Sequence, residues 1–221
     1  MLDSARVGDG RIGLAVQEMT LQKVFCVGLS KTGTTSLHAA LEQLGMRSIH
    51  NPESMLSVEG GELCFSSALA AEYDALSDLP IAAFYRELDR AFPGARFILT
   101  TRSAEPWLAS CANHFDPGAF HPNDVVRRLV ERIYGTPVYE EGAFRAAQVR
   151  HDSGVREYFA GRPSDLLVID IDESDKWTPL CRFLGISAPE ASYPHENRAS
   201  GLPQPLKRLA RAVKNRLALF L

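Results

Sequence analysis

The feature that most constrains this chain is a glycine-containing loop, Gly28-Leu-Ser-Lys-Thr-Gly-Thr-Thr-Ser36, which separates two contrasting segments. The apolar run Lys23–Val27 before it predicts a buried strand. After it, residues 35–44 carry apolar side chains at helical spacing and are followed by Gly45, a favoured helix terminator. A strand, a glycine loop and a helix in this order open an α/β unit, and the free N–H groups at the helix start can bind a phosphate.

The residue types in this loop suit an anionic ligand. Its glycines let backbone N–H groups approach closely, Lys31 adds a mobile cation, and hydroxyl groups follow at positions 34–36. The nucleotide triphosphatase pattern GxxxxGK[ST] is not met, because Thr34 stands where that pattern has its lysine. The loop therefore predicts a phosphate site of another kind, and the alternative is a plain glycine turn with a threonine cap.

Strands and helices alternate along the rest of the chain. We expect further strands at 47–50, 74–76, 96–101 and 166–171, and helices at 61–72, 81–92, 105–111, 125–134, 143–159 and 177–184. This alternation predicts an α/β fold of three layers, a P-loop-type fold with a central parallel sheet flanked by helices. Ligands in such folds bind beyond the carboxyl ends of the strands, where the loop above and the residues discussed below all fall.

The chain divides into three expected parts. Residues 1–20 are glycine-rich and acidic and are expected to be flexible, and residues 21–205 form one α/β domain with a helical insert at about 116–161. Residues 206–221 form a basic amphipathic helix that could contact an anionic membrane or a partner. The alternative for this last segment is a packed terminal helix with a solvated basic face.

Composition narrows the class of protein. A net charge of −3 argues against a general nucleic-acid binder, which would carry a basic field. The four cysteines are widely spaced, which argues against a disulfide framework and a structural zinc site and favours a reducing, cytoplasmic compartment. Two of them, Cys26 and Cys181, lie in apolar runs and are expected to be core thiols.

The segment Lys31-Thr-Gly-Thr-Thr35 resembles the 5′-phosphosulfate loop of sulfotransferases that use 3′-phosphoadenosine-5′-phosphosulfate (PAPS), which reads Lys-Ser/Thr-Gly-Thr-Thr/Ser. The resemblance is to the P-loop sulfotransferases, in their bacterial-type branch. It implies that Lys31 neutralises the bridging oxygen as the sulfuryl group leaves. It also implies that the loop holds the 5′ end of PAPS through Ser30, Lys31, Thr32, Gly33, Thr34, Thr35 and Ser36.

A second pair of residues extends the resemblance. Arg102 ends the strand at 96–101, and Ser110 follows eight residues later, the spacing at which this family binds the 3′-phosphate of PAPS. An arginine offers a planar fork to phosphate oxygens, although a surface arginine is the alternative interpretation. The stretch Pro194-His-Glu-Asn-Arg198 resembles a late loop that closes over the nucleotide, which implies that Arg198 also reaches the 3′-phosphate.

Asp78, within Ser77-Asp-Leu-Pro80, occupies the place of the family's catalytic histidine before Leu-Pro, and other branches use a carboxylate there. A free aspartate is a poor base at neutral pH, so burial would have to raise its pKa. The alternative is a turn or cap aspartate. The aromatic residue that stacks on adenine in the family is replaced by Ser36, which leaves Trp107 or Tyr193 as candidate platforms.

Together these residues predict in-line sulfuryl transfer from PAPS to a hydroxyl or amine of a small-molecule or glycan acceptor, with Asp78 as base and no metal. We interpret His114 and His121 as surface or loop histidines. Two other functions remain open: a small-molecule kinase on a divergent P-loop, and a non-catalytic relict that binds a nucleotide or a partner.

Overall fold

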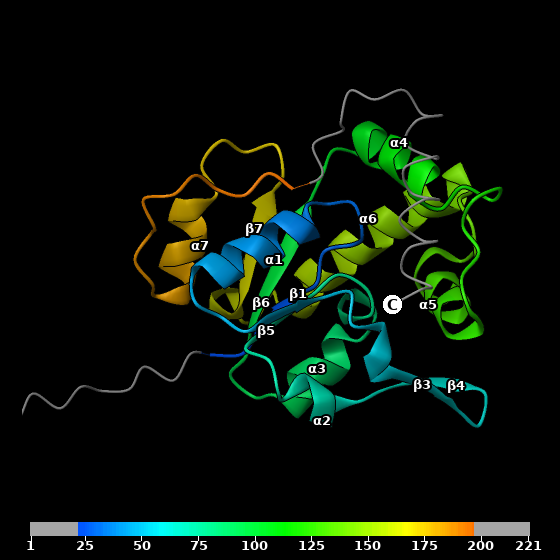
Figure 1. Ribbon diagram of the computed structural model, residues 1–221, viewed down its shortest axis with the longest axis horizontal. Helices are drawn as coiled ribbons and strands as arrows, with labels where there is room; N and C mark the ends of the chain where they lie inside the picture. The colour runs from blue at the N-terminus through cyan, green and yellow to red at the C-terminus, as the bar shows by residue number, and fades with distance from the viewer. Residues whose placement is uncertain (1–21, 197–221) are drawn as a thin grey trace, which may run out of the picture.

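The computed structural model describes residues 22–196, whose centre is a parallel sheet of five strands (Figure 1). The strands stand in the order β2 (Ser48–His50), β5 (Ala75–Ser77), β1 (Val24–Cys26), β6 (Arg96–Thr101) and β7 (Leu166–Asp170). The chain leaves β1 toward one edge of the sheet and later returns past it to build β6 and β7. The direction of winding therefore reverses beside β1, where α/β sheets place their ligands.

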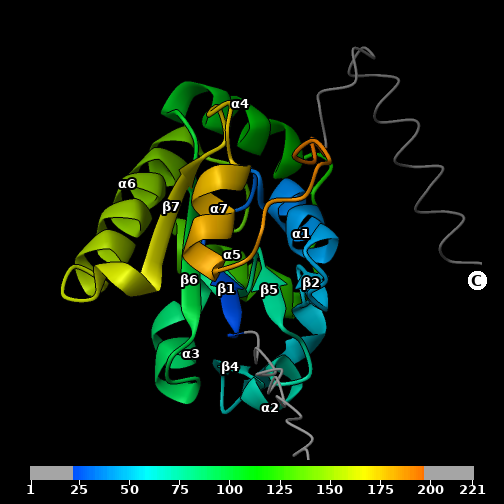
Figure 2. The same cartoon turned by 90° about the vertical axis from the view of Figure 1, so that its left-hand side faces the viewer.

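The sheet residues alternate between two apolar clusters, one on each face. Val24 and Cys26 pack with α1 (Thr34–Gln43) and α7 (Trp177–Leu184), which cover one face. Phe25 and Val27 belong to the cluster on the other face, together with four helices: α3 (Tyr85–Ala91), α4 (Ala104–His114), α5 (Asp124–Tyr134) and α6 (Glu141–Tyr158). Figure 2 shows α7 in front of the strands, with α1 to its right and α6 to its left. The expected three-layer α/β fold is confirmed.

Several expected elements are confirmed closely. The strand at 96–101 and the helix at 177–184 have the expected bounds, and Gly185 ends that helix with φ 69°. The two helices expected within 116–161 are α5 and α6. The helix expected at 81–92 is instead split into a 3₁₀ turn at Ile81–Ala83 and α3. Two further 3₁₀ turns lie at Glu53–Met55 and Pro163–Asp165.

The helix expected at 61–72 is wrong. The chain forms an antiparallel hairpin of β3 (Leu56–Glu59) and β4 (Glu62–Phe65), and only the short α2 (Ser67–Ala70) is helical. Gly60 and Gly61 have φ of 58° and 89°, the left-handed conformation that a two-residue hairpin turn requires. Leu63 and Phe65, two residues apart on β4, therefore pack against the core cluster from one face of a strand.

The terminal segments expected at 1–20 and 206–221 lie outside the described residues, as does Arg198. Within the described part of the chain, no helix is long and apolar enough to cross a membrane. All four cysteines are free thiols, and Cys26 and Cys181 are buried as expected.

Gly28 fixes the distance between the start of the loop and β6. A Cβ atom at this position would lie 1.9 Å from the Thr100 hydroxyl and 2.7 Å and 2.9 Å from its backbone O and N. The same hydroxyl lies 2.6 Å from that of Thr32, which also donates to the carbonyl of Leu29 at 2.6 Å. The absence of a side chain at Gly28 thus lets the loop pack directly on β6.

We expect Gly28→Ala to lower the free energy of unfolding by about 1–3 kcal/mol, because the backbone of Thr100 must move to admit the methyl group. Gly161→Ala is the control, since nothing lies within 4 Å of the added atom. Urea denaturation of both variants measures the difference. Equal destabilisation of the two variants would contradict this account of the loop packing.

Candidate active site

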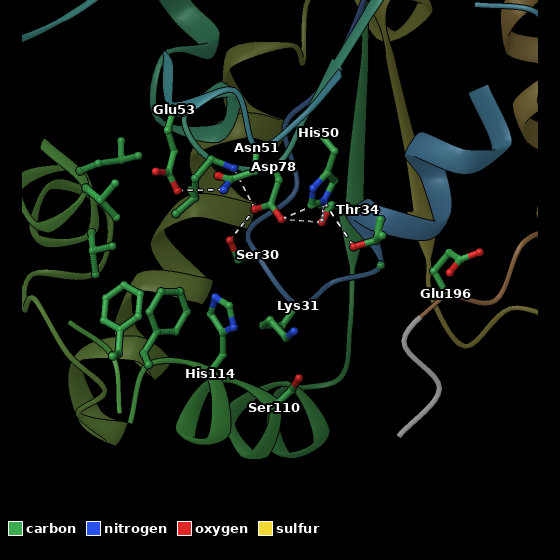
Figure 3. Close-up of a pocket in the computed structure, with 18 of the residues that line it drawn as sticks. Ser30, Lys31, Thr34, His50, Asn51, Glu53, Asp78, Ser110, His114 and Glu196 are labelled. Atoms are coloured by element: carbon green, nitrogen blue, oxygen red, sulfur yellow. Dashed lines mark hydrogen bonds and ion pairs between the residues drawn. The ribbon is translucent and has the colours of Figure 1, made fainter. Parts of the chain in front are cut away.

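A cavity of about 370 Å³ opens at the carboxyl end of the sheet (Figure 3). It is lined by the loop after β1, the first turn of α1, and the residues that follow β2, β5 and β6. It has the size of an ordinary small-ligand site and lies where the winding of the sheet reverses. Eight of the residues predicted to bind PAPS line it: Ser30, Lys31, Gly33, Thr34, Thr35, Ser36, Arg102 and Ser110. Asp78 lines it as well.

Thr32 does not reach the cavity with its side chain. Its hydroxyl is buried against Leu29 and Thr100, so it holds the loop onto the sheet. Its neighbour Gly33 has φ 99°, and a Cβ there would lie 2.9 Å from the side chain of Ile171. Thr32 and Gly33 therefore pack the loop against Thr100 and Ile171, while Lys31 and Thr34 face the cavity.

Backbone strain is concentrated around the cavity. Within residues 22–196, the non-glycine residues with positive φ are Lys31 at 74°, Asn51 at 52° and Asp78 at 68°, and all three line the cavity. Such conformations persist where the surrounding structure enforces them, and they cluster at functional sites. The strain is independent support for the site, because it does not depend on any resemblance in sequence.

The carboxylate of Asp78 is held by donors on both oxygens. Oδ1 accepts hydrogen bonds from the Ser30 hydroxyl and from the Leu79 N–H at 2.8 Å. Oδ2 accepts from the Thr34 hydroxyl at 2.9 Å and lies 3.1 Å from Nε2 of His50. Asp78 therefore ties the end of β5 to the loop after β1 and to the end of β2.

These contacts decide the ionisation of Asp78. Burial by itself raises the pKa, but the hydrogen bond and charge of His50, together with the donors Ser30 and Leu79, leave the pKa below its ordinary value. This direction is opposite to the increase that the sequence interpretation required of a base. Asp78 is thus a carboxylate at neutral pH, well placed to orient donors and weak as a proton acceptor.

His50 is a site residue that the sequence interpretation missed. Its Nε2 lies 3.3 Å from the hydroxyls of both Thr34 and Thr35, in addition to its contact with Asp78. It ends β2 at the same edge where Arg102 follows β6. The rule that ligands bind beyond the strand ends could therefore have found it.

Arg102, which follows β6, lies against the loop. Its Nη1 donates to the carbonyl of Lys31 at 3.3 Å, and its own carbonyl accepts from Gln148 at 2.8 Å. Its Nε is buried without a hydrogen-bond partner. A buried guanidinium N–H without an acceptor is costly unless a ligand supplies one, so Arg102 suits an anion in the cavity.

Three expectations about the remaining residues change. Trp107 cannot serve as an adenine platform, because it is fully buried and its indole N–H donates to the Ser30 carbonyl at 2.9 Å. Tyr193 packs against Trp177 and does not line the cavity. His114 lines the cavity, whereas His121 is exposed as expected.

The late loop reaches the site, since the Glu196 N–H donates to the Ser36 hydroxyl at 3.1 Å.

The family model described as a sulfotransferase domain matches residues 23–202 of the chain. The chain belongs to the sulfotransferase family. This sulfotransferase domain is 29% identical to the Ava biosynthesis cluster protein M of Aspergillus versicolor, an alignment that covers 78% of this chain and 80% of that protein. The crystal structure of a sulfotransferase from Alicyclobacillus acidocaldarius shares its fold, with a TM-score of 0.52 and 19% identity over 89% of this chain and 93% of that one.

We expect Asp78→Asn to lower the melting temperature at neutral pH, and the deficit to shrink as the pH falls below about 4. The pKa of Asp78 is lowered in the folded chain, so the stability it contributes is present above the unfolded pKa and is lost as the pH falls through the folded value. Thermal melting from about pH 3 to pH 8 measures this change.

Asp152 on α6 is a control of opposite sign, because burial raises its pKa to about 6. Its ionisation therefore destabilises the folded chain as the pH rises from about 4 to 6. We expect Asp152→Asn to raise the melting temperature at neutral pH and to leave it unchanged in acid. If the melting temperature of each variant differed from that of the wild type by the same amount at every pH, both pKa assignments would be contradicted.

Proposed function

We propose that this domain transfers a sulfuryl group from PAPS to a hydroxyl or amine of an acceptor. The observation that carries the proposal is that one cavity has two walls whose groups suit an anion. The first is the glycine loop with Lys31 and the hydroxyls of the first turn of α1, and the second is Arg102 with Ser110. A donor with a phosphosulfate at one end and a phosphate at the other needs two such walls.

The residues present fit this donor. The N-terminal turn of α1 offers free N–H groups and the hydroxyls of Thr35 and Ser36 to the 5′ end. Arg102 offers its guanidinium group, beside Ser110, to the 3′-phosphate. Arg198 stays a prediction outside the described residues. When bound, PAPS supplies the sulfuryl group and leaves as adenosine 3′,5′-bisphosphate.

In this mechanism Lys31 carries the positive charge of the site. Its left-handed backbone holds it at the turn of the loop, where its ammonium faces the cavity beside Ser110 (Figure 3). A cation fixed before the reaction begins stabilises negative charge as it develops on the leaving group, without reorganisation of solvent. Arg102 keeps this arrangement in place by donating to the carbonyl of Lys31.

Asp78 and Ser30 handle the proton of the acceptor. Both line the cavity, and the Ser30 hydroxyl already donates to Asp78 Oδ1. The acceptor proton reaches the carboxylate either directly or through Ser30, which takes one proton while passing on its own. His50 holds Asp78 in position for both routes through its contact with Oδ2.

The kinase alternative has less support. In nucleotide triphosphatases a lysine at position 34 would reach the terminal phosphates, but here Thr34 donates its hydroxyl to Asp78. In the described part of the chain, no three His, Cys, Asp or Glu residues are grouped closely enough to hold a metal ion. The two functions differ in the nucleotide they bind, and this difference can be measured directly.

We expect adenosine 3′,5′-bisphosphate to raise the melting temperature and ATP with Mg²⁺ to leave it unchanged.

Arg102→Ala is expected to weaken bisphosphate binding by about ten- to a hundredfold, because hydrogen bonds to charged groups contribute about 1.5–3 kcal/mol. Calorimetric titration measures the affinity. Arg90→Ala, at an exposed position on α3, is the matched control. Stabilisation by ATP in place of the bisphosphate would favour the kinase.

We expect Lys31→Ala to lower kcat by about 10²-fold or more while bisphosphate binding changes much less, because the lysine acts on charge that develops during transfer. Steady-state turnover of PAPS and calorimetry on the same variant separate the two effects. The non-catalytic alternative predicts that the wild type itself shows no turnover with any acceptor while binding the bisphosphate.

A further inference from the structure

Beyond the anion-binding residues, the cavity has a second, apolar wall. It comes from α5, from the segment that joins α4 to α5, and from the residue after Asp78. Its side chains are Leu79, Phe115, Phe120, Val126, Leu129 and Val130. Four of these are buried in the core cluster, and Phe120 and Val126 are partly buried against it. The wall is therefore fixed by packing, and its partly exposed members, Phe120 and Val126, offer apolar surface that a ligand can cover.

Aromatic rings form a shelf on this wall. The ring centroid of Phe115 lies 5.1 Å from that of Phe120 and 4.6 Å from that of His114, both in edge-to-face geometry. His114 and Phe120 are 6.1 Å apart. Aromatic faces and edges at these spacings favour contact with a further aromatic ring, which a ligand can supply.

The charges around the cavity are unevenly placed. Its cationic side chains, Lys31 and Arg102, belong to the anion-binding walls and contact each other through the Lys31 carbonyl. On α5, Arg127 and Arg128 pair with Asp124 and do not line the cavity. Among residues 22–196, the apolar wall thus offers no arginine or lysine to an anionic acceptor.

Glu53 adds a carboxylate to the side of the cavity away from Lys31 (Figure 3). Its Oε1 accepts from the Asn51 amide at 2.9 Å. A fixed negative charge here repels a negatively charged acceptor. The negative charges of a sulfated or uronic glycan would therefore be repelled by Glu53. Its hydroxyl groups would also lie against the apolar wall without hydrogen-bond partners.

We infer that the acceptor is a neutral aromatic hydroxyl compound whose ring lies against α5 and the phenylalanine shelf, and whose hydroxyl reaches Ser30 and Asp78. This inference rests on the proposed function and narrows its acceptor class. Ser30 and Asp78 suit the role because they lie between Lys31 and Glu53 in the cavity (Figure 3). An acceptor ring on the apolar wall and PAPS on the anion-binding walls then meet at these two residues.

The chemistry of the base favours a phenol over an aliphatic alcohol. Asp78 has a lowered pKa and takes protons weakly. A phenol loses its proton near pH ~10, whereas a hydroxyl of the acidity of water does so near ~15.7. In the transfer step the phenol O–H bond breaks and its proton goes to Asp78. The oxygen forms the new O–S bond as the S–O bond to the bisphosphate breaks, and that electron pair leaves with the bisphosphate.

The test places one charge on the apolar wall of the full-length chain. Val126 lies in the first turn of α5, where its N–H is capped by Asn123, so Val126→Asp adds a carboxylate at a position that helices favour. Val149→Asp is the matched control, because this valine is 65% exposed on α6 and does not line the cavity. The probes are 2-naphthol and methyl glucoside, titrated by calorimetry with adenosine 3′,5′-bisphosphate present.

We expect the wild type and Val149→Asp to bind 2-naphthol equally and methyl glucoside undetectably. Val126→Asp should weaken 2-naphthol binding by at least about tenfold, since a buried carboxylate must be desolvated against the ring. Bisphosphate binding should be the same in all three proteins, which shows that each is folded. Unchanged naphthol affinity in Val126→Asp, or tighter binding of the glucoside, overturns the inference. A failure of the proposed function differs, because the bisphosphate would then not bind to the wild type.

Discussion

The carboxylate of Asp78 is the interaction on which the site depends. It accepts hydrogen bonds from Ser30 and Thr34, both within the glycine loop, and it contacts His50 at the end of β2. One side chain thus sets the positions of three segments that are far apart in the sequence. Because the carboxylate is buried and its donors keep it ionised, the loop has a fixed shape before any ligand binds. Preorganised donors of this kind are what stabilisation of a developing charge requires.

Much of the fold was predictable because local pattern and tertiary environment agree. The strand at 96–101 is an apolar, β-branched run with both faces buried, and the helix at 177–184 ends at a glycine that adopts positive φ. The hairpin at 56–65 was missed because its apolar residues also fit a helix over a short window. Only the pair Gly60 and Gly61 distinguishes the two, through a turn that needs two residues in the left-handed region.

The site was predictable where a residue type and a strand end coincide, as for Lys31, Arg102 and Asp78. It was not predictable where the role depends on the direction of a side chain. Trp107 faces the core with Leu108 and Cys111, and its indole N–H donates to the carbonyl of Ser30 in the loop. The positive φ of Asn51 and the ionisation of Asp78 follow from tertiary contacts, which single-sequence patterns do not contain.

The contact between Glu196 and Ser36 has a consequence for synthesis of the chain. The first turn of α1 emerges from the ribosome early, but the backbone N–H that its serine accepts comes from beyond the last helix of the sheet. All five strands can therefore pair while the rim of the cavity still lacks this segment. The rim of the cavity is completed by the last-made part of the described chain, so the sheet can form before this rim does.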